Sequence, residues 1–280
     1  MSLNNISQAN PPPQDMMERC CRHPWESYLP PIKMAPDVYY ISGNDWVACY
    51  LIDTGDGLIL IDTAMHETAY LMIENIRKLG YELTNIKKIL LTHAHIDHIG
   101  AARTMKELTG ARIYLGEPDM LFLRERRDLI CGDGLYTCGD FVPDEFYADN
   151  KPVTQGNITV HTIATPGHTP GCTSMFFEVQ DKERTLRCGI HGGIGLNTLT
   201  DEDFKRSGLP VSLRQDYIDG LRKLDKLDVD ICLPSHTNQV GILQLADQIK
   251  EDYNPYINPS AWHELMNERL SRVMEIADGR

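Results

Sequence analysis

The stretch LTHAHIDHIG, residues 91–100, gathers three histidines and one aspartate into six consecutive positions. It continues an apolar run at 86–91, which predicts a buried strand, and it leads into a run at 99–108 with the apolar spacing of a helix. Loops at the ends of such elements are common places for functional side chains. The stretch therefore predicts a site at the point where a buried strand turns into a helix.

The four polar side chains in this stretch are imidazoles and a carboxylate, which are the types of ligand that zinc accepts. Side chains two apart on an extended backbone leave the same face, so His93 and His95 can point to one place. Asp97 and His98, where the chain turns into the helix, can point to a neighbouring one. Asp97 could instead cap that helix, but the H-x-H-x-D-H spacing favours a metal site.

Two further histidines follow predicted strands and complete the expected ligand sets. His168 lies in TPGHTPG at 165–171, where proline and glycine favour a tight loop directly after an apolar strand. His236 follows a Pro-Ser pair at the end of another apolar strand. A catalytic zinc site needs three protein ligands and an open position. We therefore expect two sites per chain, one built from His93, His95 and His168 and the other from Asp97, His98 and His236.

His191 stands apart from these six residues. It follows a strand predicted at 184–190 and precedes the run GGIG at 192–195, whose glycines let the backbone approach a ligand closely. Three interpretations are open: an accessory ligand, a donor to the substrate, or a turn residue. We treat His191 as a candidate catalytic residue beside Asp97, whose ionised carboxylate accepts hydrogen bonds and could orient an attacking group.

Short β-rich and helical runs alternate in an order typical of two sheets packed face to face with helices outside. Residues 1–30 are rich in proline and predict an irregular segment before a single domain at 31–280 that ends in a helix. Residues 128–150 predict a long loop. Strands are expected at 38–42, 46–53, 58–62, 86–91, 112–115, 158–163, 173–179, 184–190 and 229–233, and helices at 66–79, 99–108, 213–224, 240–249 and 259–276.

The composition restricts the partners that we expect. The chain of 280 residues carries 27 basic and 40 acidic side chains, a formal net charge of −13. This charge argues against a nucleic-acid partner and against adhesion to anionic lipid. No run approaches the roughly 20 apolar residues of a membrane span, and the polar N-terminus shows no apolar signal region. The eight cysteines are scattered without a Cys-x-x-Cys pair. We therefore expect a cytoplasmic protein that acts on a small molecule, of unknown oligomeric state.

Taken together, these motifs resemble the metallo-β-lactamase superfamily over about residues 35–245. The resemblance rests on LIDT at 60–63, the H-x-H-x-D-H segment, TPGHTPGCTS at 165–174 and the Ser-His pair that ends in His236. The TPGHTPGCTS run and the region 41–52 are similar to the third subclass of class B β-lactamases. The resemblance implies a four-layer αββα sandwich of two mixed sheets, with two zinc ions per chain held by the six residues grouped above.

The resemblance also implies a supporting role for Asp62, which would orient a ligand imidazole.

Two departures narrow the expected activity, one from the wider superfamily and one from the β-lactamase subclass. Most of the superfamily, including glyoxalase II and lactonases, carries a bridging aspartate where this chain has His191 or an adjacent glycine, and the β-lactamase subclass lacks it too. The serines that help to hold the substrate carboxylate in those β-lactamases are missing from 191–197. Flavo-diiron proteins usually carry glutamate where His95 stands, which weighs against an iron redox role.

The function that follows is a zinc-dependent hydrolase of the β-lactamase-like branch. A metal-bound hydroxide would attack the carbonyl carbon of an amide, lactam or ester. The substrate is unassigned, because the side chains around the predicted pocket point to no single ligand. The alternative is a true metallo-β-lactamase or a lactonase. An iron redox protein or a non-catalytic metal-binding module is less favoured, since a fold alone does not determine a function.

Overall fold

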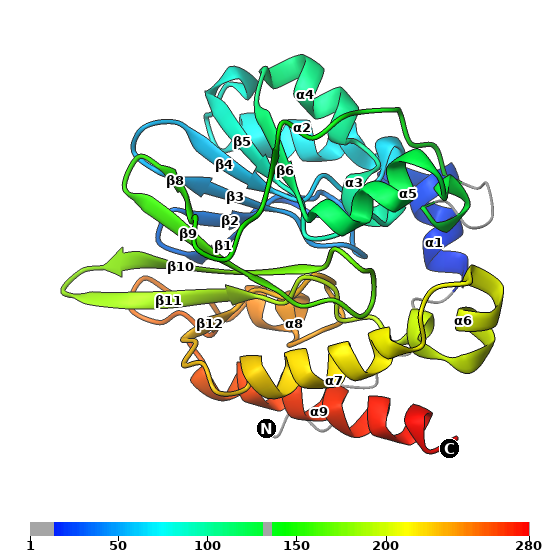
Figure 1. Cartoon of the computed structure of the whole chain (residues 1–280). Coiled ribbons are helices and arrows are strands. Elements are labelled where there is room, and N and C mark those ends of the chain that lie inside the picture. Colours follow the sequence, from blue (N-terminus) through cyan, green and yellow to red (C-terminus); the bar gives the residue numbers. More distant parts are fainter. Residues whose placement is uncertain (1–13, 131–135, 280) are drawn as a thin grey trace.

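Two β-sheets pack face to face, and helices cover the outer face of each sheet (Figure 1). The computed structural model describes residues 14–130 and 136–279. Both sheets mix parallel with antiparallel neighbours. The predicted four-layer αββα sandwich of two mixed sheets is therefore confirmed.

The first sheet has the strand order β1-β2-β3-β4-β5-β6-β7. Neighbours from β1 to β4 are antiparallel, and neighbours from β4 to β7 are parallel. The carboxyl ends of β4 and β5 therefore share an edge, where Asp62 follows β4 and the stretch 91–100 follows β5. The strands are β1 (Ile32–Ala35), β2 (Val38–Tyr40), β3 (Tyr50–Asp53), β4 (Leu58–Ile61), β5 (Ile86–Leu90), β6 (Arg112–Leu115) and β7 (Glu145–Phe146).

The second sheet has the strand order β12-β11-β10-β9-β8. β8 to β11 are antiparallel neighbours, and β12 runs parallel to β11. The carboxyl ends of β9, β11 and β12 therefore point the same way, and they are followed by the loop 165–171, His191 and the loop of His236. The strands are β8 (Val153–Gln155), β9 (Ile158–Ala164), β10 (Thr173–Asp181), β11 (Arg184–Ile190) and β12 (Ile231–Cys232).

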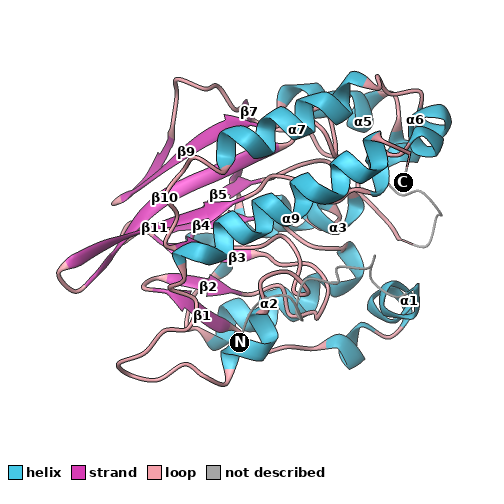
Figure 2. Ribbon diagram, turned by 90° about the horizontal axis from the view of Figure 1, so that it is seen from below, coloured by secondary structure: helices cyan, strands magenta, loops and turns pink. Residues whose placement is uncertain are grey.

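Helices form the two outer layers. α2 to α5 lie over the first sheet, and the long helices α7 and α9 run side by side over the second (Figure 2). In the part of the chain that the structure describes, no helix is long and apolar enough to cross a membrane. The helices are α1 (Gln14–Arg22), α2 (Ala69–Lys78), α3 (Ile96–Ile99), α4 (Ala102–Thr109), α5 (Met120–Arg124), α6 (Asp201–Ser207), α7 (Ser212–Leu224), α8 (Ile242–Ala246) and α9 (Pro259–Ala277).

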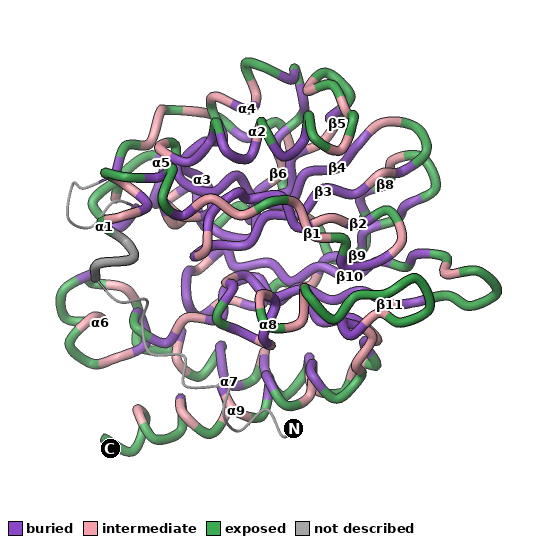
Figure 3. The backbone as a smooth tube through the Cα atoms, turned by 180° about the vertical axis from the view of Figure 1, so that it is seen from behind, coloured by how far each residue is buried: buried purple, intermediate pink, exposed green. Residues whose placement is uncertain are grey.

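Buried apolar residues form one cluster in each interface between layers. Figure 3 shows the buried stretches of the backbone gathered inside the molecule and the exposed ones at its outside. β10 shows how one strand serves two of these interfaces, since successive side chains of a strand point to opposite faces. Phe177 packs between the two sheets, whereas Phe176 packs against Trp262 of α9, with ring centroids 5.5 Å apart. Because both faces of the sheets are covered, loops at the sheet edges remain as the places where polar groups can gather.

The N-terminal region differs from the irregular segment that we expected over 1–30. Gln14–Arg22 forms α1 directly after the proline run of the sequence, as expected for a residue that is tolerated before a helix but not inside it. Cys20 of this helix is fully buried in the cluster between the first sheet and its helices. Tertiary packing thus stabilises a helix whose composition is mostly polar. Residues 1–13 lie outside the described chain.

Other predicted elements change in length for local reasons. The loop expected at 128–150 contains β7, whose pairing with β6 is supported by Asp144, which accepts the Ile113 N–H at 2.8 Å. Residues 131–135 of that loop lie outside the described chain. The helix expected at 240–249 shortens to α8, because Val240 and Gly241 have φ values of 44° and 70° and cannot belong to a right-handed helix.

Candidate metal centre

The three-histidine group lies where loops from both sheets meet. His93 and His95 follow β5, and His168 lies in the loop between β9 and β10. One ring nitrogen from each of the three lies within 4.8 Å of the others. Nδ1 of His95 lies 2.9 Å from Nε2 of His168. The structure therefore brings these three side chains together, as the sequence predicted.

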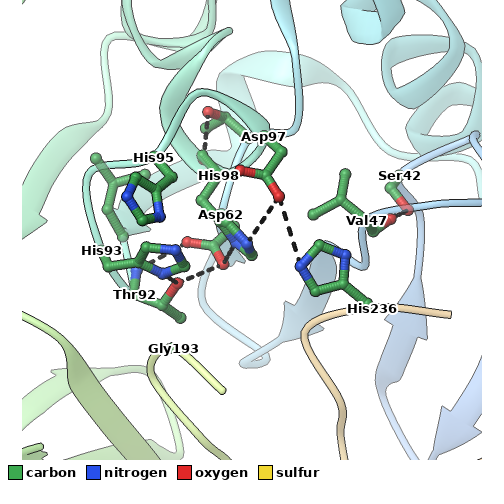
Figure 4. Close-up of polar contacts among 12 residues, drawn as sticks. Ser42, Val47, Asp62, Thr92, His93, His95, Asp97, His98, Gly193 and His236 are labelled. Carbon is green, nitrogen blue, oxygen red and sulfur yellow. Dashed lines mark hydrogen bonds and ion pairs between the residues drawn. The ribbon is translucent and has the colours of Figure 1, made fainter. Parts of the chain in front are cut away.

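The mixed group, Asp97, His98 and His236, lies beside His93 and His95 (Figure 4), and the ring centroids of His93 and His98 are 4.1 Å apart. Oδ2 of Asp97 lies 3.4 Å from Nε2 of His98 and 3.5 Å from Nε2 of His236. All three ligand-type atoms lie within 4.8 Å of one another. Asp97 is not the cap of α3, because His95 holds that position and Asp97 lies inside the first turn.

In His98 and His168 the ring nitrogen that faces away from the group has a partner that fixes the orientation of the ring. Nδ1 of His98 lies 2.7 Å from Oδ2 of Asp62, and Nδ1 of His168 lies 3.0 Å from the Thr198 hydroxyl. That hydroxyl donates to the His168 carbonyl at 2.9 Å, so the ring donates to it and keeps the lone pair on Nε2. Partners of this kind usually hold metal-ligating histidines in place.

Buried nitrogens face the two groups and test whether a cation fits there. Among the described residues, Nε2 of His93 is buried and has no hydrogen-bond partner, and Nε2 of His98 is buried and faces only the Asp97 carboxylate, at 3.4 Å. Buried polar atoms are nearly always paired in folded proteins, and an unpaired one carries a desolvation cost. A metal ion in each group would satisfy these atoms, and imidazole and carboxylate suit zinc. The residues present therefore fit two metal ions.

Burial keeps four of the imidazoles neutral. It is the largest cause of a lowered pKa at each, to about 4 for His95 and for His236. The pKa values of His93 and His168 also fall well below the ordinary range for histidine. A neutral imidazole offers a lone pair to a metal, whereas a protonated one does not. These four residues are therefore ready to bind metal at neutral pH.

The pKa values of His98 and Asp97 shift so that the charged form of each side chain is favoured. Burial lowers the pKa of His98, but the carboxylates of Asp97 and Asp62 outweigh it and raise the pKa to about 10. Burial works against ionisation of Asp97, yet the adjacent His98 holds the pKa of that carboxyl well below its usual range. In the metal-free chain a proton thus sits on His98 between two carboxylates. A bound metal ion would take the place of this positive charge.

His236 is positioned by a segment from the first sheet. Val47 forms an isolated antiparallel bridge with His236. The Thr237 N–H donates to the Trp46 carbonyl, which also accepts a hydrogen bond from the His236 side chain. This pairing explains why the strand expected at 46–53 begins only at Tyr50: the preceding residues pair with the loop of His236 instead.

His191 lies outside both groups among the residues that the structure describes. It is buried, its Nδ1 accepts the Gly193 N–H at 3.1 Å, and its ring lies 5.9 Å from that of Tyr217. Burial, with a contribution from Arg269, lowers its pKa to about 3. These contacts support the turn-residue interpretation over that of an accessory ligand, and a role as a donor to the substrate stays a prediction.

The glycine-rich run after His191 packs directly against His168. A Cβ atom on Gly195 would lie 2.5 Å from Cε1 of the His168 ring, and one on Gly193 would lie 3.1 Å from its Cδ2. Gly193 would also bring its Cβ to 2.5 Å from the Cys172 sulfur. A side chain at either position would therefore have to displace the His168 ring or the Cys172 side chain, so glycine is the residue that fits there.

Thr198 and Asp119 are supporting residues that sequence reasoning missed. Thr198 belongs to a 3₁₀ turn at Asn197–Leu199, and nothing in its sequence neighbourhood distinguishes it. Asp119 follows β6, the parallel neighbour of β5, so its position after a strand could have suggested that it shares an edge with His93.

A cleft of about 570 Å³ lies elsewhere, along β9 to β11 and Asp37, and no residue of either ligand group lines it.

Comparison with known proteins places this site in a family. The family model of the metallo-beta-lactamase superfamily matches residues 45–236. BJP-1, a subclass B3 metallo-beta-lactamase of Bradyrhizobium japonicum, has a similar structure, with 29% identity, a TM-score of 0.80 and coverage of 91% of this chain and 96% of that chain. The resemblance to the third subclass that we drew from the sequence is thereby confirmed.

Curated relatives match a shorter part of the chain. The uncharacterized protein YobT of Bacillus subtilis is 30% identical over 159 residues, which cover 54% of this chain and 66% of that protein. The hydroxyacylglutathione hydrolase GloC of Haemophilus influenzae is 28% identical over 123 residues, which cover 43% of this chain and 58% of that protein. Each match spans less than two thirds of the relative.

Proposed function

Since this chain belongs to the metallo-β-lactamase superfamily, we propose that it is a hydrolase that uses two divalent metal ions to cleave a bond at a carbonyl carbon. Zinc is the metal that we expect, because the ligands are imidazoles and one carboxylate. The observation that carries the proposal is the pair of adjacent ligand groups, in which Nε2 of His93 is buried without a partner and Nε2 of His98 faces the Asp97 carboxylate. A single structural zinc would need a closed four-ligand set instead.

The chain would contribute orientation and charge to this reaction. When bound, the two zinc ions would supply Lewis acids and lower the pKa of a water molecule to about 7. His93, His95 and His168 would hold one ion, and Asp97, His98 and His236 the other. Asp97 remains ionised and only accepts hydrogen bonds, so it would orient an attacking water through its O–H. Asp62 and Thr198 would keep the rings of His98 and His168 aligned.

The substrate that we propose is an amide, lactam or ester whose carbonyl can reach both groups. No carboxylate follows β11 in the sequence at 191–197, where most of the wider family carries its bridging aspartate. This feature favours the β-lactamase-like branch over the glyoxalase-like branch, to which the name of GloC would point.

A true β-lactamase is the second candidate, and the similarity to BJP-1 favours it. The absence of serine from 191–197 weighs against it, because the serines that help to hold the substrate carboxylate in the β-lactamase subclass would be expected there. A lactonase is a further alternative within the same chemistry. An iron redox protein or a purely metal-binding module is less favoured, since His95 supplies an imidazole where an iron redox site of this family would have glutamate.

Metal content and a substrate panel test the proposal together. Purified protein should contain close to two zinc ions per chain by elemental analysis. It should hydrolyse at least one compound among a chromogenic cephalosporin, an aryl lactone, an aryl ester and a hydroxyacylglutathione thioester, with loss of activity in a chelator and recovery with zinc. Hydrolysis that a chelator does not affect would contradict the proposal, and one iron per chain with oxygen consumption would favour the redox alternative. Fast hydrolysis of the cephalosporin would favour a true β-lactamase.

We also propose that the protein works in a reducing compartment, the cytoplasm. Six cysteines in the described part of the chain are free thiols, and five of these six are buried: Cys20, Cys49, Cys172, Cys188 and Cys232. Disulfides are rare in the cytoplasm and common outside it. Fractionation of cells that express the protein tests this proposal, which recovery in the periplasmic fraction would contradict.

A further inference from the structure

Asp119 is a buried carboxylate that no step of the proposed reaction uses. It ends a 3₁₀ turn, Glu117–Asp119, directly after β6, and its exposed fraction is 0%. Burying a carboxylate costs free energy unless hydrogen bonds compensate. Burial raises the pKa of Asp119 to about 6, against the hydrogen bonds that lower it, so the group is ionised at neutral pH. The hydrogen bonds that compensate this buried charge therefore indicate what the side chain does.

The Asp119 carboxylate joins the two loops that form the three-histidine group. Oδ2 accepts the Ala94 N–H and the Thr169 hydroxyl, each at 2.8 Å. Oδ1 accepts the Gly171 N–H at 2.6 Å. Ala94 lies between His93 and His95 in the sequence, and Thr169 follows His168 directly. One side chain thus holds the backbone next to all three histidines.

Close packing leaves this junction little freedom to relax. A Cβ atom on Gly171 would lie 2.6 Å from Cγ of Asp119, and one on Gly116 would lie 2.0 Å from the Gly171 carbonyl oxygen. The turn that carries Asp119 is therefore in backbone contact with the loop that carries His168. Phe122, in the helix that follows, lies with its ring 5.9 Å from that of His95. The same short segment thus contacts both sides of the group.

We propose that Asp119 is a positioning residue for the three-histidine metal site: its carboxylate fixes the distance between the loop of His93 and His95 and the loop of His168. The inference rests on the proposed function only in taking the group to bind metal. The three hydrogen bonds of Asp119 do not reach the mixed group: Asp97 and His98 lie in α3, and His236 is held through Trp46 and Val47. Loss of the carboxylate should therefore weaken one metal site and spare the other.

Asp119→Asn is the informative substitution, because it keeps the shape and removes the charge. One carboxylate oxygen becomes an NH₂ group that faces a backbone N–H, that of Gly171 or that of Ala94. Two N–H donors cannot bond to each other, so one of the two loops loses its backbone hydrogen bond to residue 119 and the loops should separate. Loss of a supporting partner usually lowers metal affinity by about 10- to 100-fold.

The test measures zinc affinity site by site, by competition with a chromophoric chelator. His236→Ala disables the mixed group and leaves the three-histidine group to be titrated, and His93→Ala does the reverse. Adding Asp119→Asn should weaken zinc binding about 10- to 100-fold in the His236→Ala protein. In the His93→Ala protein it should change the dissociation constant by less than about threefold, as expected for independent sites. Equal losses at both sites, or no loss at either, would overturn the inference.

Two further variants keep the outcome interpretable. Asp144→Asn is the control. It removes another carboxylate that accepts a backbone N–H, that of Ile113, and Asp144 belongs to neither ligand group, so both zinc affinities should stay unchanged.

If Asp119→Asn does not fold, Thr169→Val provides the test instead, since it removes one donor to Asp119. It should weaken zinc about threefold or more in the His236→Ala protein, as the loss of a hydrogen bond to a charged group predicts, and an unchanged value would overturn the inference. Zinc affinities that follow this pattern without hydrolysis of any substrate would refute the proposed function alone.

Discussion

The three-histidine group and the mixed group reach similar geometries in different ways. The three-histidine group joins loops 73 positions apart in the sequence, His95 to His168, and its rings are neutral and oriented mainly by hydroxyl and backbone partners. The mixed group contains an internal carboxylate, Asp97, and a second buried carboxylate, Asp62, orients His98. Without metal, the carboxylates of Asp97 and Asp62 therefore face the positive charge of His98 in and beside the mixed group. The three-histidine group instead depends on how precisely the fold brings two loops together.

This difference implies that charge and packing support the two groups unequally. Removing a carboxylate partner from the mixed group changes the electrostatics of a buried site, where charges interact strongly. Removing a hydroxyl partner from the three-histidine group takes away one neutral hydrogen bond. The expected effects can therefore be ranked, and the ranking tests whether the two groups act as distinct units.

Loss of a ligand from either group should have the largest effect. His93→Ala and Asp97→Ala should each lower kcat/KM by about 10³-fold or more, since metal catalysis supplies several kcal/mol of transition-state stabilisation. The measurement is hydrolysis of whichever panel substrate the parent protein accepts. His161→Ala, an exposed histidine of β9 outside both groups, is the matched control. Full activity in either ligand variant would refute a two-metal mechanism.

Asp62→Asn should have the next largest effect, and it should be confined to the mixed group. The substitution removes the charge that faces Nδ1 of His98 at 2.7 Å. Zinc affinity measured in the His93→Ala protein should fall about 10- to 100-fold. Affinity in the His236→Ala protein should change far less, although Asp62 also accepts the Thr92 N–H at 2.8 Å next to His93. Equal losses in both proteins would mean that the two groups cannot be treated separately.

The pH dependence of zinc binding should differ between the groups. In the metal-free chain the pKa of His98 lies at about 10, above its ordinary 6.5. Its protonation therefore stabilises the metal-free fold fully below pH 6.5, and this contribution is lost as pH rises toward 10. Zinc must displace that proton, so affinity in the His93→Ala protein should rise about tenfold from pH 7 to pH 8. In the His236→Ala protein the lowered pKa values predict little change over this range, and identical slopes in both proteins would contradict the assignment.

Thr198→Val should have the smallest effect. The substitution keeps the branched shape and removes the hydroxyl that lies 3.0 Å from Nδ1 of His168. A neutral hydrogen bond contributes about 0.5–1.5 kcal/mol, so zinc affinity of the three-histidine group should fall about two- to tenfold. The experiment is the same zinc competition in the His236→Ala protein. A loss as large as that caused by Asp62→Asn would show that charge does not distinguish the two groups.

The candidate ligands were readable from the sequence because each follows a strand that is apolar enough to recognise. His93 follows β5, His168 follows β9 and His236 follows β12. Parallel strands of one sheet share an edge, so residues after such strands tend to gather. Asp62 was inferred from resemblance, and its contact with His98 agrees with that inference. The prediction of an irregular segment at 1–30 was wrong at Gln14–Arg22, where α1 forms. This helix packs through Cys20, whose burial depends on contacts with residues distant in the sequence.

The sequence by itself determined the types of ligand, their order and the layers of the fold, because periodicity, turn residues and clustered histidines are local signals. Apart from Asp62, only the tertiary structure decided which side chains support the ligands. Thr198 lies in a short 3₁₀ turn with no distinctive pattern, and Asp119 is marked only by its place after a strand. Both matter because folding puts Thr198 beside His168 and Asp119 beside Ala94. The tertiary structure also separated His191 from the ligand groups, since the direction of a side chain after a strand depends on the packing around it.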